Sequence, residues 1–143
     1  MTTLSFYVEG IPVPQGSKSV SKSGHLFDCN AKKLKPWRRQ IADVIRASQP
    51  RTHITTPVSL SIIFRFPRPA SHFNKSGLKA SSPKYMQVKP DLDKLIRAVG
   101  DGVATDAGLL KDDSLIVSIN AEKRYCIGSE LPGALITIIL NSL

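Results

Sequence analysis

Four stretches of the chain carry the hydrophobic pattern of β-strands. Residues 4–10, 57–66 and 114–125 alternate apolar and polar side chains with a period of two, which is typical of strands that bury one face. Residues 133–140 are instead a nearly continuous run of apolar residues, mostly isoleucine and leucine. Such a run predicts a strand that is buried on both faces.

Two further stretches repeat apolar residues at intervals of three and four, which is the period of an amphipathic helix. The first helix is expected over about residues 30–48 and the second over residues 92–104. Pro36 is expected in the first turn of the first helix, because a missing N–H costs little there. The start of that helix could then slide to residue 35 or 36.

Two connecting segments show neither period. Residues 15–25 are rich in glycine, serine and lysine and contain no acidic residue, which predicts a turn or hairpin. Residues 67–90 contain four prolines, five lysines or arginines and no acidic residue. A stretch of this length without periodicity is usually functional or disordered, so we expect a long, mobile, basic loop.

The order of these elements predicts a fold class. The length of 143 residues suits one domain, so we expect a single compact α+β domain over residues 1–143. It should contain a mixed β-sheet and two main helices. The expected order is strand, hairpin, helix, strand, helix, strand, strand.

The charge of the chain indicates a polyanionic partner. There are 20 lysines and arginines against 11 acidic residues, for a formal net charge of +9, and a basic surface captures phosphate polymers. The longest apolar run is seven residues, against the roughly 20 that a membrane helix needs. The N-terminal residues lack the basic start of a signal peptide, so we expect a cytoplasmic protein without membrane association. Cys29 and Cys126 have no metal-ligand spacing, and we expect both to be reduced.

The acidic residues are concentrated in one segment. Residues 89–114 hold six of the eleven, although the chain as a whole is basic. Asp91 is the natural N-cap of the second helix and Asp93 falls in its first turn. These two carboxylates could simply stabilise the helix end, by about 1–2 kcal/mol together.

A second acidic pair points to a metal site instead. Asp112 and Asp113 directly precede the strand over residues 114–125, and a neighbouring strand could bring them beside the start of the second helix. Carboxylates that share one pocket repel each other unless a cation lies between them. Oxygen ligands without histidine favour Mg²⁺ or Mn²⁺, and such a site in a basic protein indicates phosphoryl chemistry on nucleic acid.

Basic residues supply candidate phosphate contacts. Arg97 lies one turn after Asp93 and one turn before Asp101, so it could form an ordinary ion-pair ladder or hold the scissile phosphate. Phe73 and Tyr85 could stack on exposed bases. The candidate DNA-binding residues are Lys18, Lys22, Lys33, Arg38, Arg68, Lys75, Lys79, Lys84 and Lys89.

The segment KPDLDKLIRAVGDGV, followed by KDDSLIV, resembles the RusA-type Holliday junction resolvases of bacteria and phages. Their pattern is DxDNL, a basic residue one turn later, another aspartate, and DD before a strand. The resemblance implies that Asp91, Asp93 and Asp113 are the catalytic, metal-binding acids, with Asp112 and Asp101 in supporting roles. It also implies a homodimer that introduces two symmetric, Mg²⁺-dependent nicks across a four-way junction.

Two positions depart from the family pattern. Lys94, which we expect to have a supporting role, stands where the family usually has asparagine, and Arg97 stands where a functionally important lysine is common. Arginine does not readily give up a proton, so Arg97 is expected to stabilise charge rather than to donate a proton.

The leading hypothesis is therefore a Mg²⁺-dependent, structure-selective DNA endonuclease. It would resolve four-way junctions in recombination and repair, accept Mn²⁺ in place of Mg²⁺, and need no organic cofactor. One alternative is a nuclease that acts on flaps or other branched DNA. Another is a DNA-binding protein without catalytic activity, in which Asp93→Asn would leave function intact.

Overall fold

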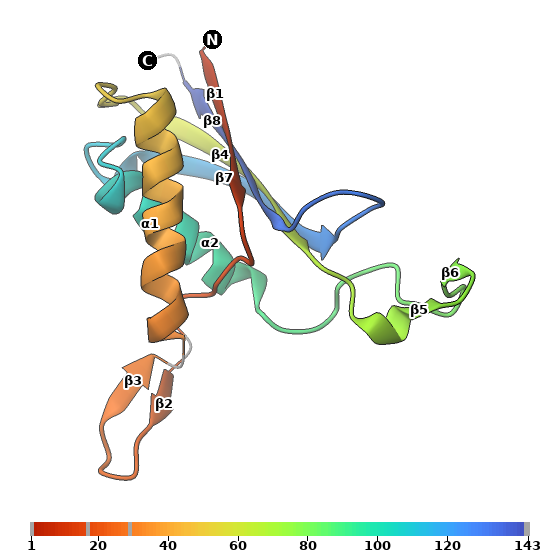
Figure 1. The fold of residues 1–143 in the computed structure, drawn as a ribbon. Helices are drawn as coiled ribbons and strands as arrows, with labels where there is room; N and C mark the ends of the chain where they lie inside the picture. Colours follow the sequence, from red (N-terminus) through yellow and green to blue (C-terminus); the bar gives the residue numbers. More distant parts are fainter. Residues whose placement is uncertain (1, 17, 29, 142–143) are drawn as a thin grey trace.

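Four strands form a mixed sheet at the centre of the protein (Figure 1). The computed structural model describes residues 2–16, 18–28 and 30–141. The strand order is β1–β8–β4–β7, with β8 antiparallel to both β1 and β4, and β4 parallel to β7. The strands are β1 (Thr3–Glu9), β4 (Val58–Phe66), β7 (Ile116–Tyr125) and β8 (Gly133–Leu140).

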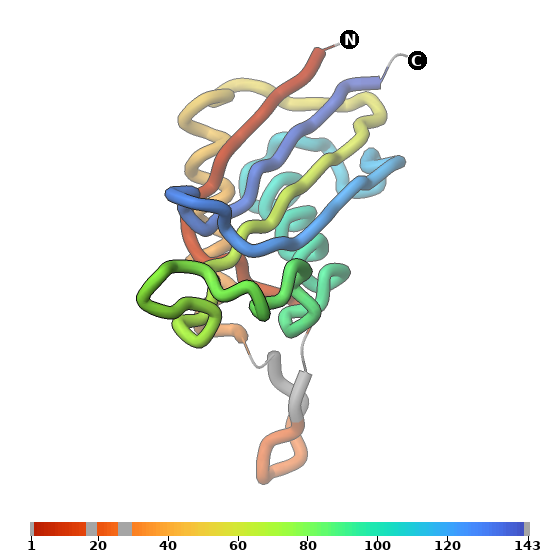
Figure 2. The backbone as a smooth tube through the Cα atoms, turned by 90° about the vertical axis from the view of Figure 1, so that its right-hand side faces the viewer, coloured from red at the N-terminus to blue at the C-terminus, as the bar shows by residue number. Residues whose placement is uncertain are grey.

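Two helices cover one face of this sheet. Figure 2 looks onto the opposite face, and the strands there cross in front of both helices. The buried core lies between the two layers, because alternate residues of β4, such as Leu60, Ile62 and Phe64, point toward the helices. Among the described elements no helix covers the other face. The single α+β domain with a mixed sheet and two helices confirms the predicted fold class.

The expectation that β8 is buried on both faces is wrong. Ala134, Ile136 and Ile138 are buried against the helices, but Leu135 on the open face is 38% exposed. Apolar residues nevertheless line the open side, because Leu135 pairs with Tyr7 of β1 and with Ile63 of β4. Cross-strand contacts between apolar side chains stabilise a sheet even without a covering layer.

The first helix, α1 (Ala31–Ser48), packs Trp37, Ile41 and Ile45 into the core. It begins close to the earliest predicted position, with Asn30 as its N-cap residue. The placement of Pro36 in the first turn is wrong, since it is the sixth residue of the helix. The helix tolerates the missing N–H because burial of its apolar face outweighs one lost backbone hydrogen bond.

The second helix, α2 (Leu92–Asp101), forms the crossover between the parallel strands β4 and β7. It ends three residues earlier than predicted and continues as a π-helical turn over Gly102–Asp106. Because a crossover helix must carry the chain back along the sheet, α2 runs opposite to both strands (Figure 1).

Two basic segments project from this body in different directions (Figure 1). The first is the hairpin of β2 (Lys18–Val20) and β3 (Leu26–Asp28). The second is the loop over residues 67–90, which contains a 3₁₀ turn (Ala70–His72) and a small hairpin of β5 (Phe73–Asn74) and β6 (Gly77–Leu78). In the described ranges, no helix combines the length and apolar character needed to cross a membrane.

Candidate active site

The start of α2 presents two carboxylates to solvent. Asp91 precedes the helix in an extended conformation, and Asp93 is in the first turn, as predicted. The Asp91 carboxylate makes no capping hydrogen bond, and its Oδ2 lies 3.5 Å from Lys94 Nζ. Lys123, near the end of β7, donates to the carbonyl oxygens of Val88 (2.7 Å) and Pro90 (2.8 Å). This amino group therefore ties the segment before α2 to the end of β7.

The other end of α2 carries Asp101 within a network of hydrogen bonds. Gln15 Nε2 donates to Asp101 Oδ2 at 2.5 Å, and Arg38 Nη1 lies 3.8 Å from the same oxygen. Arg38 also holds Asp106 through Nε (2.6 Å) and Nη2 (3.0 Å). The hydrogen bond to Asp106 raises the pKa of Arg38. Arg38, a candidate DNA contact, thus has its guanidinium engaged within the protein.

Gln15 is a site residue that the sequence did not reveal. Its backbone N–H donates to Lys94 O at 3.0 Å, and its Oε1 accepts from Arg38 Nη1 at 3.5 Å. Together with the bond to Asp101, these contacts attach the segment after β1 to both helices. Nothing in the local sequence distinguishes this glutamine from an ordinary turn residue, because all its partners are far away along the chain.

The next residue, Gly16, lies against the guanidinium of Arg97. Gly16 has a φ of 99°, and a β-carbon there would be 2.6 Å from Arg97 Nη1. Only glycine adopts this backbone conformation easily and leaves room for the guanidinium. Among the described residues, no ion pair joins Arg97 to Asp93 or Asp101. Arg97 therefore does not form the ion-pair ladder that the spacing along the helix allowed.

Asp112 and Asp113 form a pair just before β7. Asp112 Oδ1 accepts a hydrogen bond from Ser114 N at 2.9 Å, and this bond is the main cause that lowers the pKa of Asp112. The neighbouring Asp112 carboxyl raises the pKa of Asp113, and the charge of Asp101 adds to this effect. Both side chains are exposed. Asp113 therefore belongs to a concentration of negative charge with Asp112 and Asp101.

The two acidic ends of α2 are separated within one chain. A helix of ten residues is about 15 Å long, and α2 runs opposite to β7. Asp112 and Asp113 consequently lie toward the Asp101 end and not beside Asp91 and Asp93. Within the described ranges, no three Asp, Glu, His or Cys side chains gather closely enough to hold a metal ion. The metal roles of Asp91, Asp93 and Asp113 stay predictions.

The candidate DNA-binding residues fall into two groups. Arg68 is engaged within the protein, because Nη1 donates to Pro83 O at 2.8 Å and the guanidinium lies 4.6 Å from the centre of the Tyr125 ring. The side chain of Lys18 lies outside the described residues. The remaining lysines lie on projecting or exposed segments: Lys22, Lys33, Lys75, Lys79, Lys84 and Lys89.

Of the two cysteines, Cys29 lies outside the described residues. Burial raises the pKa of the half-buried Cys126 thiol.

Known proteins resemble this chain over nearly its whole length. A family model described as "Endodeoxyribonuclease RusA" matches residues 9–139, which include α2 and both acidic groups. "Uncharacterized protein YqaN" of Bacillus subtilis (strain 168) is 32% identical over 129 residues, covering 87% of this chain and 89% of that protein. The family implies Holliday junction-resolving endonuclease activity, and its nucleases are generally dependent on a divalent metal ion. The chain belongs to the RusA family of endodeoxyribonucleases.

Proposed function

We propose that the protein is a homodimeric, Mg²⁺-dependent endonuclease that resolves four-way DNA junctions by paired symmetric nicks during recombination and repair. The observation that carries the proposal is the family match, which spans the exposed acids of α2 and the acids before β7. The ends produced would be 5′-phosphate and 3′-hydroxyl, which a ligase can seal.

The chemistry of the donor side chains fits a hard divalent cation. Asp91, Asp93 and Asp113 offer only carboxylate oxygens, which Mg²⁺ prefers and Mn²⁺ also accepts. The pKa of Asp113 is raised first by the hydrogen bond that it shares with the Asp112 carboxyl and then by the negative charge of Asp112, and a cation would relieve that repulsion. A bound Mg²⁺ would lower the pKa of a water molecule and offset charge on the phosphate.

Arg97 would act on the phosphate. Arg97 is on the helix that carries Asp93 and Asp101, and its exposed guanidinium lies beside Gly16. Because arginine stays protonated, it would stabilise the charge that develops on the phosphate oxygens. Exposed lysines of the β2–β3 hairpin and of residues 67–90, such as Lys22 and Lys75, would hold the junction arms.

Strand β7 offers a surface for the second copy. It lies at the edge of the sheet and pairs only with β4 within the described chain. Val117 and Ile119 on this strand are 63% and 45% exposed. An edge strand with exposed apolar residues is a template for pairing with another chain. A two-fold axis would set two β7 strands antiparallel.

This pairing would bring the separated acids together. Antiparallel β7 strands place the start of one strand beside the end of the other. Asp113 precedes the start of β7, and Lys123 ties the segment before Asp91 to the end of β7. Asp113 of one copy would therefore approach Asp91 and Asp93 of the other. The dimer would contain two equivalent sites, one for each nick.

A cleavage assay tests the activity. The substrates are a labelled immobile four-way junction, a flap and a linear duplex, each with Mg²⁺, with Mn²⁺ and with EDTA. We expect symmetric nicks in the junction that disappear with EDTA and with Asp93→Asn, while the variant still binds. Preferred cutting of the flap would favour the alternative nuclease. Tight binding without metal-dependent cutting of any substrate would refute the nuclease proposal.

A mixing experiment tests the shared site. Asp93→Asn and Asp113→Asn copies are co-expressed with different tags and the mixed dimer is purified. If each site draws on both copies, one site of the mixed dimer carries both substitutions and the other carries neither, so nicking of one strand returns. If each site lies within one copy, both sites remain damaged and the mixed dimer stays inactive.

A further inference from the structure

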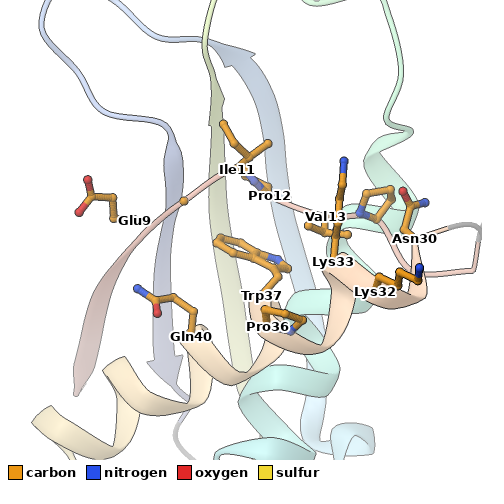
Figure 3. A pocket seen from close by; sticks show the side chains of 12 residues that line it. Glu9, Ile11, Pro12, Val13, Asn30, Lys32, Lys33, Pro36, Trp37 and Gln40 are labelled. Atoms are coloured by element: carbon orange, nitrogen blue, oxygen red, sulfur yellow. The ribbon is translucent and has the colours of Figure 1, made fainter.

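A hollow of about 600 Å³ lies between the end of β1 and the first half of α1 (Figure 3). One wall is the segment after β1, with Ile11, Pro12 and Val13. The opposite wall is formed by Pro36 and Trp37 of α1. The size is within the range of small-molecule pockets, and mainly apolar walls suit a flat, weakly polar group.

The rim of the hollow is basic. Lys32 and Lys33 are exposed on the first turn of α1, and both belong to its lining (Figure 3). Glu9 is the only acidic residue among the described residues that line it. An apolar hollow with two lysines at its edge is complementary to an apolar group that carries negative charge beside it.

Trp37 adds a hydrogen-bond donor to this environment. The side chain is only 4% exposed, and its nitrogen edge is turned toward Val13 and Lys33 (Figure 3). The indole N–H is buried and has no acceptor within the described chain. A buried donor without a partner is unfavourable, so an acceptor that reaches this edge, after a small shift of the side chains that cover it, would gain a hydrogen bond.

We propose that this hollow binds an unpaired nucleobase of branched DNA, with Lys32 and Lys33 on the flanking phosphates. The inference rests on the proposed function, since it takes DNA as the substrate. An unpaired base has apolar faces, acceptor atoms on its edge and a phosphate on either side, which match the walls, the indole N–H and the rim. A fully paired duplex supplies such a base only after unstacking it, whereas a branch point supplies one at low cost.

The position of the hollow connects it to the acids of α2. Val13 in its wall is two residues before Gln15, which bonds to Asp101 and to the backbone of Lys94. Gly16 follows and lies against Arg97. A base held in the hollow would therefore be anchored to the same segment that contacts α2. This sets a fixed relation between the captured base and the phosphate that is cut.

The fluorescence of Trp37 provides a direct test, because it is the only tryptophan of the chain. The protein is titrated in EDTA with a duplex, with the same duplex containing one bulged nucleotide, and with an abasic residue in that bulge. We expect the bulged base alone to change the fluorescence and to tighten binding about tenfold over the other two, as a stacked base typically does.

Variants at the hollow test the contacts. Ile11→Glu places a charge at the mouth, where residue 11 is 52% exposed, and should remove the preference for the bulged base while duplex binding persists. Lys32→Ala with Lys33→Ala should weaken binding of the bulged duplex more than Lys35→Ala with Arg39→Ala, which removes two exposed charges of the same helix that do not line the hollow.

The outcomes separate this inference from the nuclease proposal. An equal response to the abasic bulge, or a fluorescence change that depends on protein concentration without DNA, would overturn the base site. The second result would show that another copy fills the hollow. Because these titrations contain no metal, a base-dependent response without junction cutting would refute only the nuclease, and cutting without that response would refute only the base site.

Discussion

Substitution of Gly16 by alanine tests whether the segment after β1 positions Arg97. The new β-carbon would lie 2.6 Å from Arg97 Nη1, so the guanidinium has to move away. The end of an arginine side chain moves at little cost in stability. The main cost is the φ of 99°, which is unfavourable for alanine by about 1–2 kcal/mol. If Arg97 then no longer donates a hydrogen bond to the charged phosphate, the transition state loses about 1.5–3 kcal/mol of stabilisation. Junction nicking should slow about 10- to 100-fold.

Gly24→Ala is the matched control. Gly24 has a φ of 87°, but a β-carbon there would meet no atom within 4 Å. Both variants should lose similar stability in urea unfolding, and only Gly16→Ala should slow single-turnover nicking of a saturating junction. Equal nicking by the two variants, or a defect of Gly16→Ala that saturating DNA abolishes, would refute the positioning of Arg97 by this segment.

Three further results are expected. Gln15→Ala removes the hydrogen bond to Asp101 and should lower the free energy of unfolding by about 1–2 kcal/mol, measured with urea. The pKa of Asp113 is raised by Asp112, so the stability tied to this group is lost as pH rises through its folded-state pKa. Asp113→Asn should therefore raise the melting temperature of the metal-free protein at neutral pH, and the gain should vanish in acid. Glu130, between β7 and β8, accepts hydrogen bonds from Arg124 at 2.7 and 2.9 Å, and these bonds lower its pKa from 4.5 to about 2. The stabilisation is therefore present above pH 4.5 and is lost as pH falls toward 2. Glu130→Gln should destabilise the protein at neutral pH but progressively less below 4.5, and a constant difference across this range would contradict the assignment.

The period of the apolar residues was sufficient to locate the main elements. The strands and α1 appear within a few residues of their predicted bounds, because each buries one face and its side chains repeat with the backbone geometry. The acidic motif was equally readable, since it lies in one contiguous segment. Its resemblance to the RusA family is supported by the match over residues 9–139.

Contacts between segments that are distant along the chain could not be predicted from the sequence pattern. Gln15 and Arg38 come from different elements, and only the packing of α1 against α2 brings them to Asp101. Arg38 therefore looked like a free phosphate contact in the sequence. The double burial predicted for β8 also failed, because a run of apolar residues does not reveal whether one or two layers cover a sheet.

The amino-acid sequence indicated which residues carry the candidate chemistry: the acids at both ends of one helix, the arginine between them and the excess of basic charge. Where these groups lie in space depends on how the strands and helices pack. Because β7 is parallel to β4, α2 must run opposite to β7, and Asp113 lies away from Asp91 and Asp93 in a single chain. Strand direction is set by hydrogen bonds between segments far apart in the sequence, so the local period of apolar residues does not predict it.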